Sequence, residues 1–213
     1  YRSLTKGDTM IAMSPDMTNG KVSGNVPYGT LTTIHESPLR FGLIYTGTDD
    51  GNIHRSYDGG YTWEQLNAKP AVPTQTKKTK TPATPDSRLT TNGLWVSRVT
   101  ASQHKEARVY TSLNGYRFDN FAPYLYISED YGASWKQIGR DLPHEPINVV
   151  KEDPKNDSII YVGTDGGLYV SFDRGNSFMF WNAGMPTSVP IHDIAIQQRE
   201  NEIVLGTHGR SLY

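Results

Sequence analysis

The stretch Ser56-Tyr-Asp58-Gly-Gly60-Tyr-Thr62-Trp63 decides how this chain folds, because the chain repeats it. The pattern S-x-D-x-G-x-[ST]-[WF] returns at residues 128–135 and again at residues 171–178. A degenerate fourth copy begins at Ser3, with Thr5 in place of the aspartate and Met10 in place of the aromatic residue. Repeats of this kind indicate an array of equivalent structural units, so they set the expected architecture.

The spacing of the copies predicts four-stranded units. Successive first serines stand 53, 72 and 43 residues apart, and the shortest gap matches the roughly 40–50 residues of one propeller blade. Before the copies that begin at Ser56 and Ser171, two β-rich runs flank a glycine-containing turn, which is typical of a hairpin. We expect first strands at 31–35, 96–101, 147–151 and 191–196, and fourth strands at 62–66, 134–138 and 177–181.

These strands predict an all-β fold, a β-propeller segment of three full blades with partial blades at both ends. The predicted blades span 30–68, 95–141 and 146–184, and the partial blades span 1–29 and 190–213. Residues 67–92, rich in Pro, Thr and Lys, are expected to form a mobile insertion that serves as a solvated linker. Either the chain is a segment of a larger propeller, or its two ends complete one shared blade and close a four-bladed ring. The third strand is encoded at both ends, which favours the segment.

The repeated octapeptide is expected to be structural rather than catalytic. An aspartate before a glycine turn accepts backbone N–H bonds across that turn, and the final aromatic residue packs between neighbouring sheets. Equivalent aspartates on different blades lie too far apart for a paired-carboxylate site. The positions assigned this role are Ser56, Asp58, Gly60, Trp63, Ser128, Asp130, Gly132, Trp135, Ser171, Asp173, Gly175 and Phe178.

The octapeptides resemble Asp-box, or BNR, repeats. Together with the stretches 45–52, 95–98, 123–132, 191–194 and 206–211, they are most similar to sortilin-like propellers and to secreted bacterial BNR-repeat "glycosyl hydrolase" proteins. The resemblance covers nearly the whole chain except 67–92. It implies a propeller in a secreted, periplasmic or cell-surface protein, although this stretch carries no signal-peptide pattern. It does not imply one activity, because such propellers include hydrolases and receptors.

The composition argues against several classes of partner and cofactor. The net charge of −1 gives no global field that would favour nucleic acid, and no apolar run is long enough to span a membrane. The absence of cysteine excludes disulfides and thiolate metal sites. The acidic turn 49–52 lacks the spacing of a calcium loop, and the histidines lack ligand spacing. We therefore expect neither a metal nor another cofactor.

The insertion Asn114–Pro123 is the best candidate binding surface in the sequence, because aromatic faces beside charged groups suit sugar rings or peptide side chains. The alternative is that Arg117 and Asp119 pair with each other while the aromatic residues pack beneath the loop. Arg98, on a predicted innermost strand, and His104, at the following turn, are further candidates. The insertion contributes Tyr116, Arg117, Phe118 and Asp119, with Phe121 nearby.

His192 and Asp193 form a possible acid/base unit on another inner strand, but adjacent strand residues point to opposite faces, which favours a structural role. His208 and Arg210 flank Gly209 in a turn, and Arg210 is suited to bind a carboxylate. Sialidases use three arginines in this way. Arg98, Arg117 and Arg210 come from different blades, and no Tyr-Glu nucleophile pair accompanies them.

The sequence therefore predicts a secreted or surface-exposed interaction or scaffold module that binds a glycan, a protein or other subunits, with no catalytic residue in this stretch. The alternative is a fragment of a glycoside hydrolase of the xyloglucanase-like type. Two loop carboxylates facing a cleft would distinguish the hydrolase.

Overall fold

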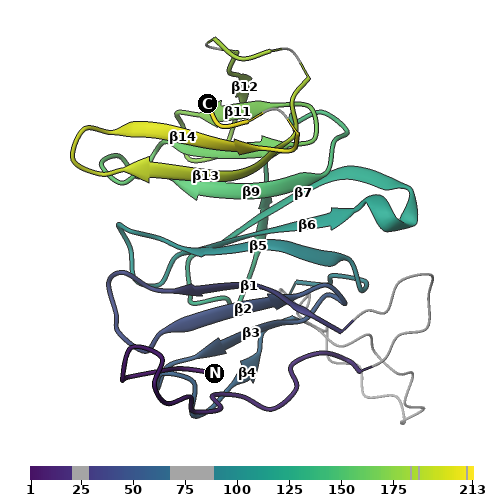
Figure 1. Ribbon diagram of the computed structural model, residues 1–213. Coiled ribbons are helices and arrows are strands. Elements are labelled where there is room, and N and C mark those ends of the chain that lie inside the picture. Colours follow the sequence, from purple (N-terminus) through teal and green to yellow (C-terminus); the bar gives the residue numbers. More distant parts are fainter. Residues whose placement is uncertain (21–28, 68–88, 183, 187, 210) are drawn as a thin grey trace, which may run out of the picture.

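Antiparallel sheets follow one another along the chain in the computed structural model (Figure 1), which describes residues 1–20, 29–67, 89–182, 184–186, 188–209 and 211–213. Within these residues, three sheets have four strands each, ordered as in the sequence, and a fourth sheet has two. The first contains β1 (Leu31–Glu36), β2 (Ile44–Thr48), β3 (Ile53–Ser56) and β4 (Glu64–Gln65). The second contains β5 (Trp95–Ala101), β6 (Val109–Gly115), β7 (Asn120–Ser128) and β8 (Lys136–Ile138). The third contains β9 (Ile147–Glu152), β10 (Ile160–Thr164), β11 (Leu168–Ser171) and β12 (Met179–Phe180), and the last contains β13 (Ile191–Gln197) and β14 (Glu202–Thr207).

The all-β prediction is confirmed, and one 3₁₀ turn, η1 (Tyr116–Phe118), interrupts the strands of the described chain. No helix among the described residues is long and apolar enough to cross a membrane. The fourth strands are shorter than expected, with two or three residues each, because the repeated octapeptide occupies the chain up to residues 63, 135 and 178.

Most of the predicted insertion 67–92 lies outside the described residues, but both of its ends are packed. Asn67 accepts a hydrogen bond from the Ile53 N–H (2.9 Å). Leu89 is buried in the core of the first two sheets, and the Thr91 hydroxyl donates to the Gly51 carbonyl (2.7 Å). Contacts of Asn67, Leu89 and Thr91 therefore hold the described ends of the predicted insertion against the sheets.

Each octapeptide is closed by one serine and one aspartate. The Ser56 hydroxyl accepts bonds from the N–H groups of Asp58 (3.3 Å) and Gly60 (2.8 Å) and donates to the Asp58 carboxylate (2.8 Å). That carboxylate also accepts the N–H and hydroxyl of Thr62. The copies around Asp130 and Asp173 make the same five bonds.

The degenerate copy adopts the same shape without an aspartate. Ser3 accepts from the N–H groups of Thr5 (3.2 Å) and Gly7 (2.7 Å), and the Thr5 hydroxyl accepts the Thr9 N–H (2.9 Å). The bridge between Arg2 and Ile11 stands 53 positions before the pairing of Arg55 with Glu64. Residues 2–11 thus have the geometry of the end of a blade, with a threonine hydroxyl in the position of the carboxylate.

A glycine in each octapeptide lets neighbouring units approach closely. Gly60, Gly132 and Gly175 have φ values of +98°, +91° and +81°, a region that side chains strain to adopt. A Cβ atom at these positions would lie 2.5–2.6 Å from Met13, Leu66 or Ile138, each ten residues after the first serine of the preceding copy. The same glycine therefore sets the spacing of three successive interfaces.

The innermost strands β1, β5, β9 and β13 lie side by side (Figure 1). Each carries a β-bulge at an equivalent place, at Thr32, Ser97, Asn148 and His192. The Thr32 hydroxyl donates to the Val96 carbonyl of the next sheet (2.9 Å), and the Ser97 hydroxyl donates to the Ile147 carbonyl (2.6 Å). The bulge turns a side chain toward the neighbouring strand, so short polar groups join the first three sheets.

A buried ionic network joins the second and third sheets. Glu152 is 1% exposed and accepts bonds from Ser102, Gln103 and Tyr110. Arg108, also buried, contacts Glu152 (3.2 Å), Glu129 (2.8 Å) and Asp157 (3.1 Å). One arginine therefore neutralises carboxylates from both sheets.

We expect Arg108→Met to lower the free energy of unfolding by about 3 kcal/mol, because Glu152 would lose its cationic partner while it stays buried. The matched control is Arg174→Met, which removes an exposed ion pair with Asp157 and should cost less than about 1 kcal/mol. Urea denaturation of both variants tests this. Equal losses would contradict the role of Arg108.

We expect the octapeptides to make stability depend on acidic pH. Hydrogen bonds from Ser177 and then Ser171 lower the pKa of Asp173 from 3.8 to about 2. A carboxyl group with a depressed folded-state pKa stabilises the fold above its unfolded pKa, and this contribution is lost as pH falls from about 4 to 2. Denaturation midpoints across this range should fall less steeply for Asp173→Asn than for the parent chain. Parallel curves would show that the charge is not linked to folding.

Candidate functional site

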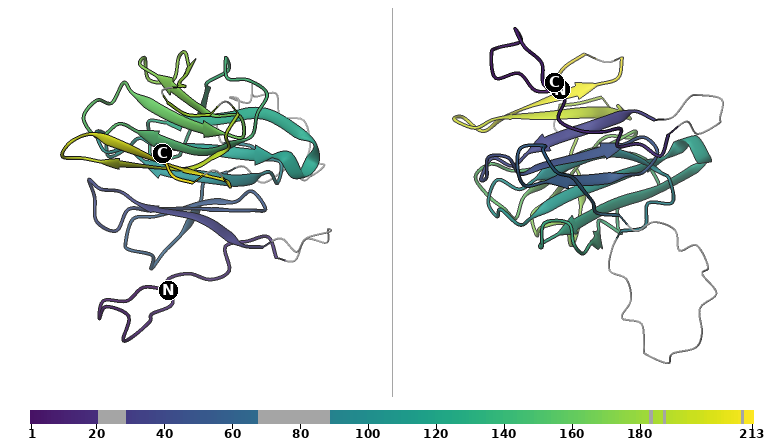
Figure 2. Two further views of the ribbon diagram at one scale, coloured as in Figure 1. Left: turned by 45° about the horizontal axis from the view of Figure 1, so that its top comes forward. Right: turned by 90° about the horizontal axis from the view of Figure 1, so that it is seen from below.

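The β6–β7 hairpin reaches beyond the neighbouring hairpins (Figures 1 and 2). The predicted insertion Asn114–Pro123 forms its tip, where η1 is followed by Asp119 in the left-handed conformation (φ 53°). The Asn114 side chain caps the turn by accepting the Tyr116 N–H (3.0 Å). Local hydrogen bonding therefore gives this tip a defined shape.

Aromatic rings and one arginine define the surface of the tip. Tyr116, Phe118 and Phe121 are 48%, 57% and 47% exposed. The Trp95 and Tyr116 rings meet edge to face, with centroids 6.3 Å apart, and the Arg117 guanidinium lies 5.2 Å from the centre of Trp95. We call the following set the hairpin surface: Asp49, Trp95, Tyr116, Arg117, Phe118 and Phe121.

Arg117 pairs across sheets rather than within its loop. Its Nη1 atom lies 3.6 Å from the Asp49 carboxylate, in the β2–β3 turn of the first sheet. Asp49 is buried and accepts the N–H groups of Gly29 (2.9 Å) and Thr30 (2.8 Å). The alternative in which Arg117 pairs with Asp119 and the rings pack beneath the loop is not what the structure has, because the turn brings Arg117 against Asp49 and leaves three rings in solvent.

A second cluster lines the space between the innermost strands. Arg98 on β5 contacts the Asp193 carboxylate (3.0 Å) and the His192 carbonyl (3.1 Å) on β13. A cavity of about 60 Å³ lies beside this pair, and Lys151 of β9 and His35 of β1 also line it. We call His35, Arg98, Lys151 and Asp193 the inner-strand cluster.

Burial and charge set the protonation of this cluster. Burial, reinforced by the charges of Lys151 and Arg98, lowers the pKa of His35 to about 4. The His35 ring accordingly accepts the Ala101 N–H (3.2 Å). Burial also lowers the pKa of Lys151, which Asp193 partly offsets. His35 is therefore neutral at pH 7.

His192 and Asp193 do not follow the alternation expected of adjacent strand residues. Both are exposed, because the bulge at His192 interrupts the pleat. The His192 ring meets His208 edge to face, with centroids 5.4 Å apart, while Asp193 binds Arg98. The two side chains have different partners, so this geometry does not form an acid/base unit.

The remaining candidates do not join these clusters. The His104 ring forms a hydrogen bond with the Asp153 carbonyl (2.8 Å). The backbone N–H of His104 donates to the Ser102 hydroxyl (3.0 Å), so both contacts of this residue are structural. Arg210 lies outside the described residues. Arg98 and Arg117 bind different carboxylates, so the structure does not bring these two together. Among the described residues, no group of three or more His, Asp or Glu side chains could hold a metal ion.

Sequence reasoning missed four members of these clusters: His35, Asp49, Trp95 and Lys151. Lys151 had a detectable signal, since it is a charged residue at the end of the predicted strand 147–151, directly after Val149 and Val150. Asp49 had none, because its contact with Arg117 joins two hairpins 68 residues apart in the sequence.

The architecture agrees with comparisons to known proteins. Residues 123–211 match a family described as "Sortilin, neurotensin receptor 3" (Sortilin-Vps10). No curated protein matches the chain. The chain has a β-propeller fold with Asp-box repeats. Among solved structures, the GH74 xyloglucanase from Xanthomonas campestris is similar with 17% identity and a TM-score of 0.59, over 84% of this chain and 27% of that one.

Two other similar structures are an extracellular domain and a complex with a peptide. The extracellular domain of BT3049, a putative hybrid two-component system of B. thetaiotaomicron, has 15% identity and a TM-score of 0.61, over 92% of this chain and 23% of that one. YCF48 bound to D1 peptide has 16% identity and a TM-score of 0.53, over 83% of this chain and 46% of that one. At these identities the likeness shows the fold, and the chain spans about a quarter of the length of the first similar chains.

We expect the His35 imidazole to titrate near pH 4 rather than near its ordinary value of 6.5. The unfolded chain binds this proton at higher pH than the folded chain, so His35 reduces stability as pH falls from 6.5 toward 4. Histidine NMR spectra, assigned with a His35→Phe variant, measure the midpoint. A midpoint near 6.5 would contradict the burial and charge described for the inner-strand cluster.

Proposed function

We propose that this segment is an interaction module of an extracellular or cell-surface protein, and that its hairpin surface binds a peptide segment of a protein partner. The observation that carries this proposal is the group of exposed rings Tyr116, Phe118 and Phe121 beside Arg117. Aromatic residues and arginine are enriched where proteins bind one another, because they bury much area with little loss of side-chain entropy.

The contacts of the surface support preorganisation. Arg117 is held between Trp95 and Asp49, and the turn is closed by Asn114 and Asp119, so little ordering remains to be done on binding. The exposed rings of Phe118 and Phe121 offer apolar area that an apolar residue of a peptide can cover.

The relatives support the same class of function. One similar structure is described as bound to a peptide, and others are extracellular domains of signalling proteins. These descriptions belong to those proteins, and they agree with a module that presents a binding face. Arg98, His192, Asp193 and His208 would then form the polar part of the same face, towards the innermost strands.

A glycoside hydrolase is the alternative, and the similarity to GH74 enzymes motivates it. Hydrolysis requires two carboxyl groups facing a cleft, roughly 5–10 Å apart. Within the hairpin surface the one carboxylate is Asp49, which is buried and bonded to two backbone N–H groups and to Arg117. Such a carboxylate is committed to structure.

We expect a random-peptide phage library to yield a peptide whose dissociation constant rises more than about tenfold with Phe118→Ala. Fluorescence anisotropy with the synthesised peptide measures the change. Tyr61→Ala is the matched control, since Tyr61 carries an exposed ring (86%) in the octapeptide 56–63 and is not part of the hairpin surface. A glycan array and an assay of xyloglucan hydrolysis complete the test. Cleavage of xyloglucan, or a peptide that Phe118→Ala leaves unaffected, would overturn the proposal.

A further inference from the structure

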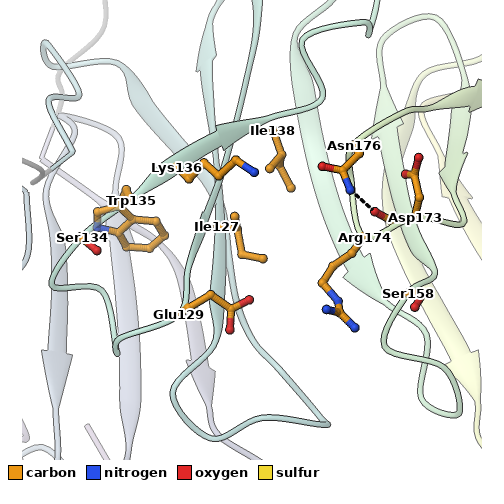
Figure 3. Close-up of a pocket in the computed structure, with 10 residues that line it drawn as sticks. All are labelled: Ile127, Glu129, Ser134, Trp135, Lys136, Ile138, Ser158, Asp173, Arg174 and Asn176. Atoms are coloured by element: carbon orange, nitrogen blue, oxygen red, sulfur yellow. Dashed lines mark hydrogen bonds between the residues drawn. The ribbon is translucent and has the colours of Figure 1, made fainter.

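A groove of about 540 Å³ separates the second and third sheets at their outer edge (Figure 3). It lies at the Ser128 end of β7, whereas the hairpin surface lies at the Asn120 end, about 25 Å away along the strand. We call it the rim groove, and its central residues are Ile127, Glu129, Lys136, Ile138, Arg174 and Asn176. It is therefore separate from the hairpin surface.

Because the units repeat, the rim groove can be compared with the equivalent space between the first and second sheets, which side chains close. The strand pair of Arg55 with Glu64 corresponds to the pair of Ile127 with Lys136. Between the first and second sheets, Arg55 donates to the Tyr131 carbonyl (2.6 Å) and pairs with Glu64. The Tyr57 and Tyr131 rings meet with centroids 5.6 Å apart. An arginine and two rings thus fill the space between two successive octapeptides.

Between the second and third sheets, these bridging side chains are replaced. Glu129 takes the position of Tyr57, and Arg174 takes that of Tyr131. Glu129 is drawn to Lys105 and Arg108, and Arg174 is drawn to Asp157, so neither side chain bridges the gap. Figure 3 shows them on opposite walls, with Ile127 on the wall of Glu129. Ile127 stands where the first sheet has Arg55, and this shorter side chain leaves the groove open.

The charges that line the groove are balanced. Glu129 and Asp173 oppose Lys136 and Arg174. Burial raises the pKa of Glu129, but the hydrogen bonds from Lys105 and Arg108 outweigh it and lower that pKa below its ordinary value. The Asp173 carboxylate is occupied within its own octapeptide. The lining therefore carries no net charge that would select an ionic ligand.

The rim groove combines an apolar strip with hydrogen-bonding groups beside it. Ile127 on β7 and Ile138 on β8 lie on the wall formed by the second sheet, and Trp135 lies at one end (Figure 3). The Lys136 ammonium makes no hydrogen bond or ion pair with a described residue, and the Glu129 oxygens can accept further bonds. A ligand with hydroxyl groups at its edges and C–H groups on its faces matches this lining.

We propose that the rim groove binds a short uncharged oligosaccharide of about two or three sugar rings, a size consistent with typical ligand pockets. The C–H faces of the sugars lie on Ile127 and Ile138. Hydroxyl groups bond to Lys136, Glu129 and Asn176. This binding site is independent of the hairpin surface and of the peptide proposed for it.

The experiment uses cellotriose, maltotriose and triacetylchitotriose as probes, with trigalacturonic acid as the anionic comparison, each titrated into the 213-residue chain by calorimetry. The key variant is Ile127→Arg/Lys136→Glu, which installs the residues that close the preceding interface. Ile127 and Arg55 are similarly buried, at 7% and 8% exposure. The variant is therefore expected to fold, with a thermal midpoint within a few degrees of the parent.

We expect at least one neutral trisaccharide to bind, and the double variant to weaken that binding more than about tenfold. The control Phe118→Ala, in the hairpin surface, should leave it unchanged. Binding of none of the neutral probes would overturn the proposal, as would equal binding to the double variant. Binding of trigalacturonic acid alone would show that Lys136 selects anions, which also overturns it.

Discussion

The bond between a serine hydroxyl and two backbone N–H groups, closed by a carboxylate, is the interaction on which this structure depends. It holds each octapeptide in a loop that ends with a glycine at positive φ. That glycine allows the next unit to approach, since a Cβ atom there would collide with Met13, Leu66 or Ile138. The loop therefore fixes the spacing between sheets, and the buried side chains pack to that spacing.

Because the octapeptide loops fix the spacing between the sheets, most of the candidate binding residues lie outside these loops. The aspartates are saturated with hydrogen bonds and have depressed pKa values at Asp58 and Asp173. The units differ from one another where one unit meets the next. The β6–β7 hairpin adds exposed rings, the inner strands add Arg98 and Lys151, and the rim of the second sheet has Ile127 where the first has Arg55. A repeated frame thus carries three different surfaces.

Much of the fold could be predicted because its signals are local. A serine, an aspartate and a glycine within five residues make a turn whatever surrounds them, and β-branched runs on either side make strands. Even the degenerate copy could be recognised, since Thr5 supplies an acceptor where the others have a carboxylate. The contacts of Leu89 and Thr91 could not be predicted, because they join these residues to positions distant in the sequence.

The sequence alone determined the blade pattern, the structural role of the octapeptides and the hairpin 114–123 as a feature of interest. The tertiary structure decided which side chains meet. It paired Arg117 with Asp49 and Arg98 with Asp193, placed a bulge where His192 and Asp193 were expected to alternate, and opened a groove at one interface while closing another. The physical reason is range: turn chemistry acts over a few residues, whereas these contacts join positions 68 to 95 residues apart, whose proximity exists only after the sheets have stacked.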